Sequence, residues 1–369
     1  DQDMALLRGL GVEFRFGQTA GVDFTLDGLR ADGFEAIFVA VGAQLAKRLG
    51  LPGEDAEGVM DALRFLRSVR EGAPVPVGPR VGVIGAGDTA MDTVRSALRV
   101  GATEASLIYR RTIDQMPADP EEIHACHEEG VGIVELAKPA ALHIEDGRLV
   151  GLVCTRTEYR GERDSAGRKI PFDVPESEFE IPVDTLVLAI SQHSVLDFLG
   201  AQLPEHTSAG YHEADPFTFE TSVPGIYAGG DVAGDGPSSI VKAAAEGKAV
   251  AAAIAVALGD GAGEETAPEP LSRVDVHEMV KRRARRQYRV PIEFAPTSDR
   301  GGFEQTVVGY TASQAMAEAD RCLDCHTMCS LCVGVCPNMA LLTYGSEPFR
   351  AALPRLHVVD GELVAGERE

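Results

Sequence analysis

Short, continuous apolar runs alternate with helical periodicity along the middle of the chain, a pattern typical of buried strands separated by helices. The run Val81–Ile84 precedes a glycine-rich turn, after which a helical pattern continues to about Arg99. A second apolar run covers Ala105–Tyr109, and a charged helical stretch covers Glu121–Gly130. Strand, helix and strand at this spacing predict a right-handed βαβ crossover, and therefore an α/β fold.

The segments on either side of this crossover carry further strand and helix patterns. Before it, we expect strands over Gly11–Phe16 and Phe34–Val41 and a helix near Met60–Arg70. After it, the pattern predicts antiparallel strands across Gly132–Pro182 with a polar hairpin near Gly161–Gly167, a buried strand over Thr185–Ile190, a strand ending at Gly230 and an alanine-rich helix over Ser239–Leu258. Glu71–Arg80 and Gly259–Pro270 have the glycine and proline content of linkers.

Composition and charge narrow the class of protein. A chain of 369 residues, 44% hydrophobic and 25% charged, is long enough for two or three domains of an ordinary soluble type. The net charge of −23 argues against nucleic acid or an anionic membrane as the main partner. The longest apolar run, Ala249–Leu258, is ten residues long and too short to span a bilayer. We therefore expect neither nucleic-acid binding nor membrane insertion.

The start of the chain and its cysteines indicate where the protein works. The sequence begins at Asp1 without a methionine or a secretory signal, in what looks like the middle of a domain. We therefore expect a fragment or a split chain. Five of the seven cysteines fall between Cys322 and Cys336. This clustering favours a metal centre in a reducing compartment, and therefore the cytoplasm.

The turn after the first central strand has the composition of a dinucleotide site. Residues 81–90 read VGVIGAGDTA, which is G-x-G-x-x-A between a strand and a helix. Gly85 permits a tight turn, Gly87 lets the backbone approach a pyrophosphate, and Ala90 allows close packing of helix and strand. Asp88 and Thr89, at the helix start, belong to the same expected site. A structural glycine turn is the alternative.

The end of the second central strand indicates which nicotinamide cofactor binds. An NAD site usually places an acid there to bind the ribose 2′-hydroxyl. This chain has Arg110 and Arg111 instead, and guanidinium groups suit a 2′-phosphate. We therefore expect NADPH. Two solvated arginines at a strand end are the alternative.

Three strand ends are candidates for contact with a second cofactor. Gly42 follows the strand predicted at Phe34–Val41, and Gly230 and Asp231 follow the strand that precedes the alanine-rich helix. The third strand-to-loop edge is Thr185–Gln192. A carboxylate at such a position can hold a ribityl or ribose hydroxyl. Ser238 or Ser239 can cap the helix, whose positive end then faces a reduced flavin. Taken singly, each is also compatible with a buried strand and a turn.

The cysteine cluster has the spacing C-x2-C-x3-C-x2-C-x3-C-P, and its five members are the expected metal ligands: Cys322, Cys325, Cys329, Cys332 and Cys336. Thiolates at this spacing favour a [4Fe-4S] cluster. Structural zinc and free buried cysteines are the alternatives. Four ligands fill one cluster and five cannot fill two, so one cysteine is spare or other ligands take part.

Four longer stretches resemble the glutamate synthase small-subunit family, among the flavoproteins with two dinucleotide-binding domains. They are FVAVGA at 38–43, VIGAGDTAMD at 83–92, YRRTIDQMPA at 109–118 and GIYAGGDVAGDGPSSIVKAAAEGKAVA at 225–251. The resemblance covers residues 1 to about 258. It implies that NADPH reduces FAD and that electrons pass through [4Fe-4S] clusters to a partner, with the cofactor roles of Asp231 and of the nucleotide-site residues carried over.

Two departures from that family bear on FAD binding. The family's first glycine fingerprint, which holds the FAD pyrophosphate, would lie before Asp1, so an upstream segment or another chain must complete the site. Ser191 also stands where the family usually has glycine. The tail, with the preceding Phe303–Asp320, resembles the C-terminal iron–sulfur extension of selenate-reductase-like flavoprotein subunits.

Together these features predict a Rossmann-like NADPH domain at 78–190 inserted in a partial FAD domain at 1–77 and 191–260, followed by a linker and iron–sulfur segment at 261–369. The expected function is an NADPH-dependent electron-input subunit that serves a redox partner, such as the glutamate synthase large subunit or another reductase. The alternative is a non-catalytic scaffold that binds nucleotide and a cluster.

Three other functional interpretations have less support in the sequence. A thioredoxin-reductase-like enzyme needs a redox cysteine pair facing the flavin, and no C-x-x-C occurs outside the tail. Cys126 lies between His124 and His127, and a metal site is one interpretation; because no fourth ligand is evident, we favour a surface helix with incidental histidines. The basic run Lys281–Arg286 is expected to be a solvated helix face, with a docking surface for an acidic partner as the alternative.

Overall fold

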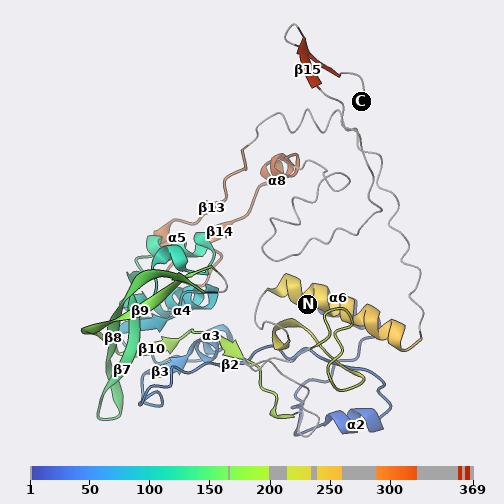
Figure 1. The fold of residues 1–369 in the computed structure, drawn as a ribbon, viewed down its shortest axis with the longest axis horizontal. Helices are drawn as coiled ribbons and strands as arrows, with labels where there is room; N and C mark the ends of the chain where they lie inside the picture. Colours follow the sequence, from blue (N-terminus) through green and yellow to red (C-terminus); the bar gives the residue numbers. More distant parts are fainter. Residues whose placement is uncertain are drawn as a thin grey trace.

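The computed structural model describes residues 2–164, 167–198, 214–233, 239–259 and 288–321, and the backbone of two short strands at 356–359 and 362–365. Figure 1 shows two lobes side by side. The central lobe comprises the described residues between 47 and 191, and the flanking lobe comprises residues 2–46 and the described residues between 192 and 259. Among the described helices, none is both long and apolar enough to cross a membrane.

The central lobe is built on a five-stranded parallel sheet in the order β3-β10-β4-β5-β6. Its strands are β3 (Val59–Asp61), β4 (Arg80–Ile84), β5 (Glu104–Ile108), β6 (Gly132–Val134) and β10 (Thr185–Leu188). The predicted βαβ crossover is confirmed, because α4 (Asp88–Arg99) connects β4 to the parallel β5. The strands are continuously apolar because both faces of the sheet are covered.

Helices cover one face of this sheet. The helices are α3 (Ala62–Glu71), α4 and α5 (Pro120–Glu128). Phe65 from α3 and Met91 and Val94 from α4 are almost completely buried against Val83 and Leu107 of the sheet. The spacing of Met91 and Val94 puts both on one side of the helix, which explains why the helical pattern was readable from the sequence.

An antiparallel sheet covers the other face. It consists of β7 (Ala137–Glu145), β8 (Arg148–Arg163) and β9 (Lys169–Pro182) in that order, as the sequence predicted. Leu152 and Cys154 alternate along β8 and pack on Ile108 and Leu186 of the parallel sheet. The β7–β8 turn has positive φ at Asp146 and Gly147, the conformation that Asp-Gly favours in tight hairpins.

The flanking lobe joins segments that are far apart in the sequence. Its strands β1 (Ile37–Val39) and β12 (Ile226–Ala228) pair in parallel, and its helices are α1 (Gln2–Gly9), α2 (Leu26–Ala31) and α6 (Ile240–Ala257). The chain passes between lobes through β2 (Leu45–Ala46) and β11 (Gln192–His193), which pair with each other. The predicted insertion of one domain in another is therefore confirmed.

Three expectations about the first 80 residues need revision. The strand predicted over Gly11–Phe16 is wrong, because this mostly exposed segment has no strand partner among the described residues and its alternation only stacks Phe14 on Phe16. The strand predicted over Phe34–Val41 is shorter and covers Ile37–Val39. Strand β3 and helix α3 pack with the central sheet although they lie before residue 78, which favours a domain boundary near residue 47, directly after β2.

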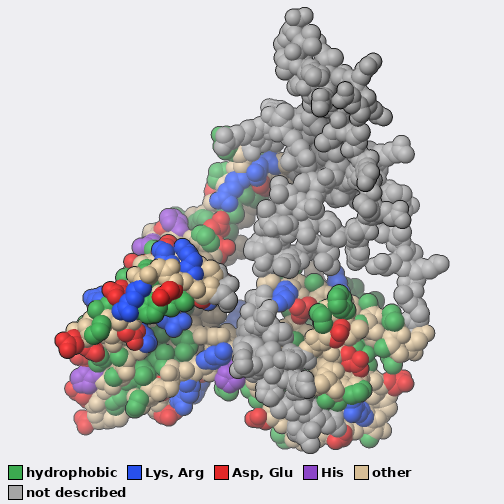
Figure 2. All heavy atoms as spheres, viewed as in Figure 1, with side chains coloured by type: hydrophobic (Ala, Val, Ile, Leu, Met, Phe, Trp, Pro, Cys, Tyr) green, Lys and Arg blue, Asp and Glu red, His purple; other side chains and the backbone are tan. Residues whose placement is uncertain are grey.

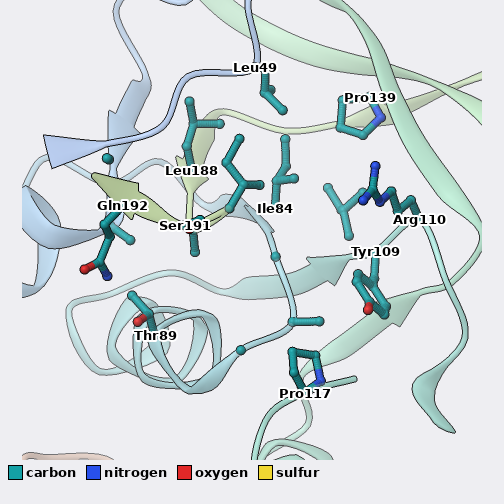
Figure 3. Close-up of a pocket in the computed structure, with 18 of the residues that line it drawn as sticks. Leu49, Ile84, Thr89, Tyr109, Arg110, Pro117, Pro139, Leu188, Ser191 and Gln192 are labelled. Atoms are coloured by element: carbon teal, nitrogen blue, oxygen red, sulfur yellow. The ribbon is translucent and has the colours of Figure 1, made fainter. Parts of the chain in front are cut away.

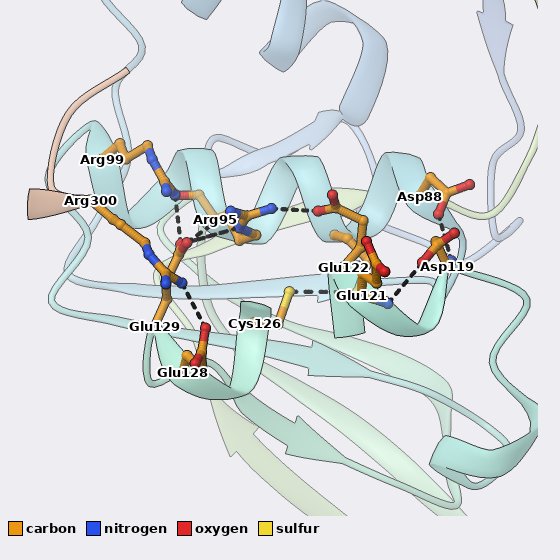
Figure 4. A network of polar contacts seen from close by, with 11 residues as sticks. Asp88, Arg95, Arg99, Asp119, Glu121, Glu122, Cys126, Glu128, Glu129 and Arg300 are labelled. Atoms are coloured by element: carbon orange, nitrogen blue, oxygen red, sulfur yellow. Dashed lines mark hydrogen bonds and ion pairs between the residues drawn. The ribbon is translucent and has the colours of Figure 1, made fainter. Parts of the chain in front are cut away.

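Residues 288–321 form an arm that packs against α4 and α5 of the central lobe. The arm contains β13 (Glu293–Phe294) paired with β14 (Val307–Val308), and α8 (Ala312–Ala319). Arg300 is 7% exposed, and its Nη1 lies 2.8 Å from Glu128 Oε2 (Figure 4). Arg99 Nε donates to the carbonyl of Gly302 at 2.8 Å. Beyond the arm, β15 (Leu356–Val359) and β16 (Glu362–Ala365) form a hairpin.

Candidate functional site

The turn after β4 is shaped by a glycine that no other residue can replace without movement. Gly85 has φ of +144°, and a Cβ built on it would lie 2.3 Å from the carbonyl oxygen of Ala189, just beyond the end of β10. The Gly85 N–H donates to the carbonyl of Ile108 at 3.3 Å. The turn therefore lies between the ends of β10 and β5, at the carboxyl edge of the sheet.

The start of α4 is open above the same turn. Gly87 is the N-cap residue, with no side-chain cap, and a Cβ built on it would meet nothing within 4 Å. The first N–H groups of a helix have no intrahelical partners, so they can bind an anion such as a phosphate. Ala90 is completely buried against the sheet, which is the packing role expected for it.

The loop before α5 is fastened to this turn. Asp88 Oδ1 accepts a hydrogen bond from the backbone N–H of Asp119 at 2.9 Å, and the Ala86 carbonyl accepts from the Ala118 N–H at 3.2 Å. The Asp88 carboxylate is thereby bound to a loop of the protein at the helix start (Figure 4). Thr89 remains half-buried on the pocket wall.

A pocket of about 880 Å³ opens at the ends of β4, β5 and β10. Gly85, Gly87, Asp88 and Thr89 line it, and Figure 3 shows Thr89 and Tyr109 on either side of the glycine turn. The carboxyl edge of a parallel sheet is where open α/β folds bind ligands, and the volume lies within the range of cofactor sites. The structure thus brings the predicted glycine turn and the end of β5 to one cavity.

The two arginines after β5 both line the pocket but differ in their surroundings. Arg110 is exposed, and Figure 3 shows it beside Pro139 at the pocket wall. Arg111 is only 5% exposed, and its Nε donates to the carbonyl of Lys169 at 2.9 Å. The alternative of two solvated arginines therefore fails for Arg111. Sequence reasoning missed its burial because the contacting residue lies 58 positions later in the chain.

Three further residues at the pocket were not predicted. Lys138 of β7 and Arg168, directly before β9, line the same pocket as Arg110. Glu54 is 7% exposed and accepts from the backbone N–H groups of Leu49 (3.1 Å) and Leu51 (2.6 Å), so it shapes the loop that carries these two pocket-lining residues. The Gly167-Arg168-Lys169 stretch, a basic pair after a glycine, was the available signal for Arg168.

Ser191, at the exit from the central lobe, has a backbone conformation that suits glycine. Its φ is +114°, and it also lines the pocket. Its carbonyl accepts from the Lys47 N–H at 3.0 Å, which joins the two chain segments that cross between lobes. The departure from the glycine usual in the family therefore coincides with a strained position.

The expected flavin residues lie in the flanking lobe around β12. Gly42 and Gly230 both have positive φ, of +69° and +73°. The Gly230 N–H donates to Glu246 Oε2 of α6 at 2.6 Å, and Asp231 follows within the short helix Gly230–Val232. Ser239 caps α6 by accepting from the Lys242 N–H at 3.3 Å. The other candidate cap, Ser238, lies outside the described residues.

The predicted cluster ligands, Cys322, Cys325, Cys329, Cys332 and Cys336, lie outside the described residues, as does Lys281–Arg286. Within the described part of the chain, no group of three or more His, Cys, Asp or Glu side chains could hold a metal ion. Cys126 and Cys154 are fully buried, and burial raises the pKa of each thiol to about 12. Cys126 therefore packs in the core of the lobe, beside Met91, and is not a surface residue.

Comparison with known proteins agrees with this architecture. The model of the pyridine nucleotide-disulphide oxidoreductase family matches residues 8–247. The chain is 36% identical over 338 residues to the NADP(+)-dependent formate dehydrogenase subunit beta of Moorella thermoacetica, covering 88% of this chain and 47% of that protein. It is 35% identical over 263 residues to the glutamate synthase [NADPH] small chain of Escherichia coli K12, covering 67% and 55%.

A third relative matches most of the chain in sequence, and a solved structure matches its fold. The NADPH-Fe(3+) oxidoreductase subunit beta of Geobacter sulfurreducens is 31% identical over 360 residues, covering 88% of this chain and 53% of that protein. The oxidoreductase FprA of Mycobacterium tuberculosis has the same fold, with a TM-score of 0.52 over 66% of this chain and 68% of that chain at 19% identity.

The chain spans about half the length of these curated relatives. The resemblance to the glutamate synthase small-subunit group is confirmed, as is the α/β fold with one lobe inserted in another. The chain belongs to the pyridine nucleotide-disulphide oxidoreductase family.

Proposed function

We propose that this chain binds NADPH in the central-lobe pocket and serves as the electron-input part of a flavin and iron–sulfur oxidoreductase. The observation that carries the proposal is the pocket itself, where a sterically restricted Gly85 and an open Gly87 lie at the start of α4 and Arg110 lies at the end of β5. These features fit a dinucleotide pyrophosphate at the helix start and a 2′-phosphate beside the guanidinium.

The flanking lobe supports a site for FAD that further residues must complete. Gly42, Gly230 and Asp231 would hold the part of the flavin nucleotide nearest β1 and β12. A two-stranded parallel sheet is incomplete by itself, and Phe38 and Val41 beside it remain 37% and 40% exposed. We propose that an upstream segment or another chain supplies the remaining strands and the first glycine fingerprint.

When bound, FAD would supply the change from hydride acceptance to single-electron release, and a [4Fe-4S] cluster on the clustered cysteines would conduct electrons onward. The donor set of thiolates followed by proline fits such a cluster, with four of the five cysteines as ligands. The protein's own task is to bind and orient these groups. A cytoplasmic redox partner protein would receive the electrons.

The nucleotide proposal is tested by the Arg110→Ala variant. We expect the KM for NADPH in dye reduction by the reconstituted complex to rise about tenfold or more, while the KM for NADH changes little, because a charge-assisted contact is lost. Arg67→Ala is the matched control, since Arg67 lies on α3, pairs with Glu71 and does not line the pocket. The double variant with Arg111→Ala should show a larger effect.

Two results would contradict the proposal. Equal changes in the KM for NADPH and NADH would remove the assignment of Arg110 to the 2′-phosphate. Nucleotide binding without dye reduction, even with FAD supplied, would favour the alternative of a scaffold subunit that has no turnover.

A further inference from the structure

We infer that the β8–β9 hairpin completes the 2′-phosphate site, with Arg168 contacting the phosphate and Asp164 holding Arg111 and Arg168 in place. This inference rests on the proposed binding of NADPH and deepens it. It assigns a recognition role to a part of the antiparallel sheet that otherwise only covers the parallel sheet.

Arg168 is held in place by the turn that carries it. Its backbone N–H donates to Asp164 Oδ1 at 2.9 Å, and its Nε donates to Asp164 Oδ2 at 3.0 Å. The Asp164 N–H in turn donates to the Arg168 carbonyl at 2.9 Å. The Arg168 side chain is 45% exposed and lines the pocket. Among the described residues these contacts use only its Nε, so both Nη groups can donate to a ligand.

The same carboxylate also holds the buried arginine of β5. Arg111 Nη2 lies 3.3 Å from Asp164 Oδ2, the oxygen that accepts from Arg168. One carboxylate therefore draws two guanidinium groups together, and their combined charge exceeds its own. Arg110, which lines the same pocket, adds a third positive charge to these two. This excess suits a phosphate dianion, which accepts several charge-assisted hydrogen bonds.

Three other basic residues near this pocket form ion pairs with carboxylates of their own. Lys138 Nζ lies 2.7 Å from Asp173 Oδ2, and Lys169 Nζ lies 3.3 Å from Asp114 Oδ2. Arg48 pairs with Asp55.

The hairpin and the loop after β5 are joined into one unit. Thr157 Oγ1 of β8 donates to the Arg110 carbonyl at 2.8 Å, and the Thr112 N–H donates to the Tyr159 hydroxyl at 2.8 Å. The extended part of β8 thereby fixes the backbone on which Arg110 stands. The hairpin that carries Arg168 and the loop that carries Arg110 are therefore fixed relative to each other, as a preorganised binding site requires.

An acid at this wall could instead read a ribose 2′-hydroxyl, as in NAD sites. The contacts of Asp164 disfavour that role, because its two oxygens already accept three hydrogen bonds from Arg111 and Arg168. A carboxylate occupied in this way serves to position the arginines.

The test compares two ligands that differ only in the 2′-phosphate, adenosine 2′,5′-bisphosphate and 5′-AMP, titrated calorimetrically against the full chain. Arg168→Ala should weaken bisphosphate binding on the order of 10-fold or more and leave 5′-AMP binding within about twofold. Asp164→Asn should weaken bisphosphate binding by about fivefold, because Arg111 and Arg168 are no longer held in place. Arg168→Lys should bind the bisphosphate better than Arg168→Ala but less well than the unmodified chain. Arg160→Ala is the matched control, since Arg160 lies on the same hairpin over the Phe172 ring and does not line the pocket.

The outcomes separate the inference from the function on which it rests. If Arg168→Ala behaves like Arg160→Ala while Arg110→Ala removes the preference for bisphosphate, the hairpin has no part in recognition and the inference is overturned, although NADPH binding stands. If Asp164→Asn weakens 5′-AMP and bisphosphate equally, Asp164 binds the ribose and the assigned role is wrong. If the unmodified chain does not prefer bisphosphate over 5′-AMP, the NADPH proposal itself fails.

Discussion

The two lobes of this chain differ in how completely each one is folded by its own residues. In the central lobe, both faces of the parallel sheet are covered, and the sheet carries two buried apolar clusters. In the flanking lobe, one small cluster surrounds a two-stranded sheet: Leu26, Val39, Ile226, Ala228 and Val232. The difference teaches that the central lobe has an extensive core made by its own residues, whereas the described residues of the flanking lobe make only a small one.

The two lobes also differ in the charge of their surfaces and in the space around their glycine turns. In the view of Figure 2, charged side chains of both signs are spread over the central lobe, whereas the flanking lobe shows fewer of them among hydrophobic side chains. A Cβ on Gly85 would collide with backbone, whereas a Cβ on Gly230 would lie 3.5 Å from the nearest atom. The central-lobe turn is closely enclosed, and the turn after β12 has room around it.

The largest expected effect comes from truncating one core residue in each lobe. Leu107→Ala should destabilise the central lobe by about 2–5 kcal/mol, because the fully buried side chain leaves a cavity between sheet and helices. Ile226→Ala should cost about half as much, because the small cluster around it can collapse more easily. Hydrogen exchange of peptides from β5 and β12 measures each lobe separately. Equal losses would show that the lobes are equally complete.

An intermediate effect is expected at the ion-pair network that joins α4 and α5. Glu129 lies 2.8 Å from both Arg95 and Arg99, and its side chain is 6% exposed (Figure 4). Glu129→Gln should destabilise the central lobe by about 2 kcal/mol, because the buried Arg99 loses its carboxylate partner and Arg95 keeps only Glu122. Glu121→Gln is the control, since Glu121 makes a surface pair with Arg289 at 3.6 Å.

The same residue predicts a pH dependence for the central lobe alone. Burial raises the pKa of the Glu129 carboxyl, but hydrogen bonds from Arg95 and Arg99 outweigh this effect and lower the pKa below its usual value. Its stabilising contribution is therefore complete above the unfolded-state pKa of about 4.3 and declines as pH falls further. Urea unfolding between pH 3 and 6, followed by hydrogen exchange, should show a steeper loss in the natural chain than in Glu129→Gln. Parallel curves would contradict this assignment.

The smallest effect is expected where the two lobes meet. Ser191→Gly should stabilise the chain by about 1 kcal/mol, because φ of +114° is strained for serine. Ser191→Ala keeps the strain and serves as the control. Thermal unfolding measures both variants. A glycine variant no more stable than the alanine variant would mean that the surrounding contacts, including the Lys47 bond, compensate the strain.

The sequence predicted the central lobe well because its signals are local. The β4 strand, the glycine turn and α4 lie within twenty consecutive residues, and their periodicities do not depend on distant partners. The strand predicted over Gly11–Phe16 failed for the opposite reason. Alternation alone does not make a strand without a neighbour to receive its hydrogen bonds.

The predicted site shows the same limit. The pocket position of Gly85, Gly87 and Arg110 followed from motif and spacing. The burial of Arg111 and the approach of Arg168 depend on a hairpin more than fifty residues further along the chain, and no local pattern encodes that contact. The packing of Arg300 on Glu128 spans 172 positions and was likewise beyond reach of the sequence.

The paired strands β2 and β11 have a consequence for the modularity of the chain. Ala46 lies opposite Gln192 and Leu45 opposite His193, so the polypeptide leaves the flanking lobe and returns to it at adjacent points. A whole pocket-bearing module could therefore be excised or transplanted at these two points without displacing either cut end of its host. One redox scaffold can in this way accept modules with different coenzyme preferences.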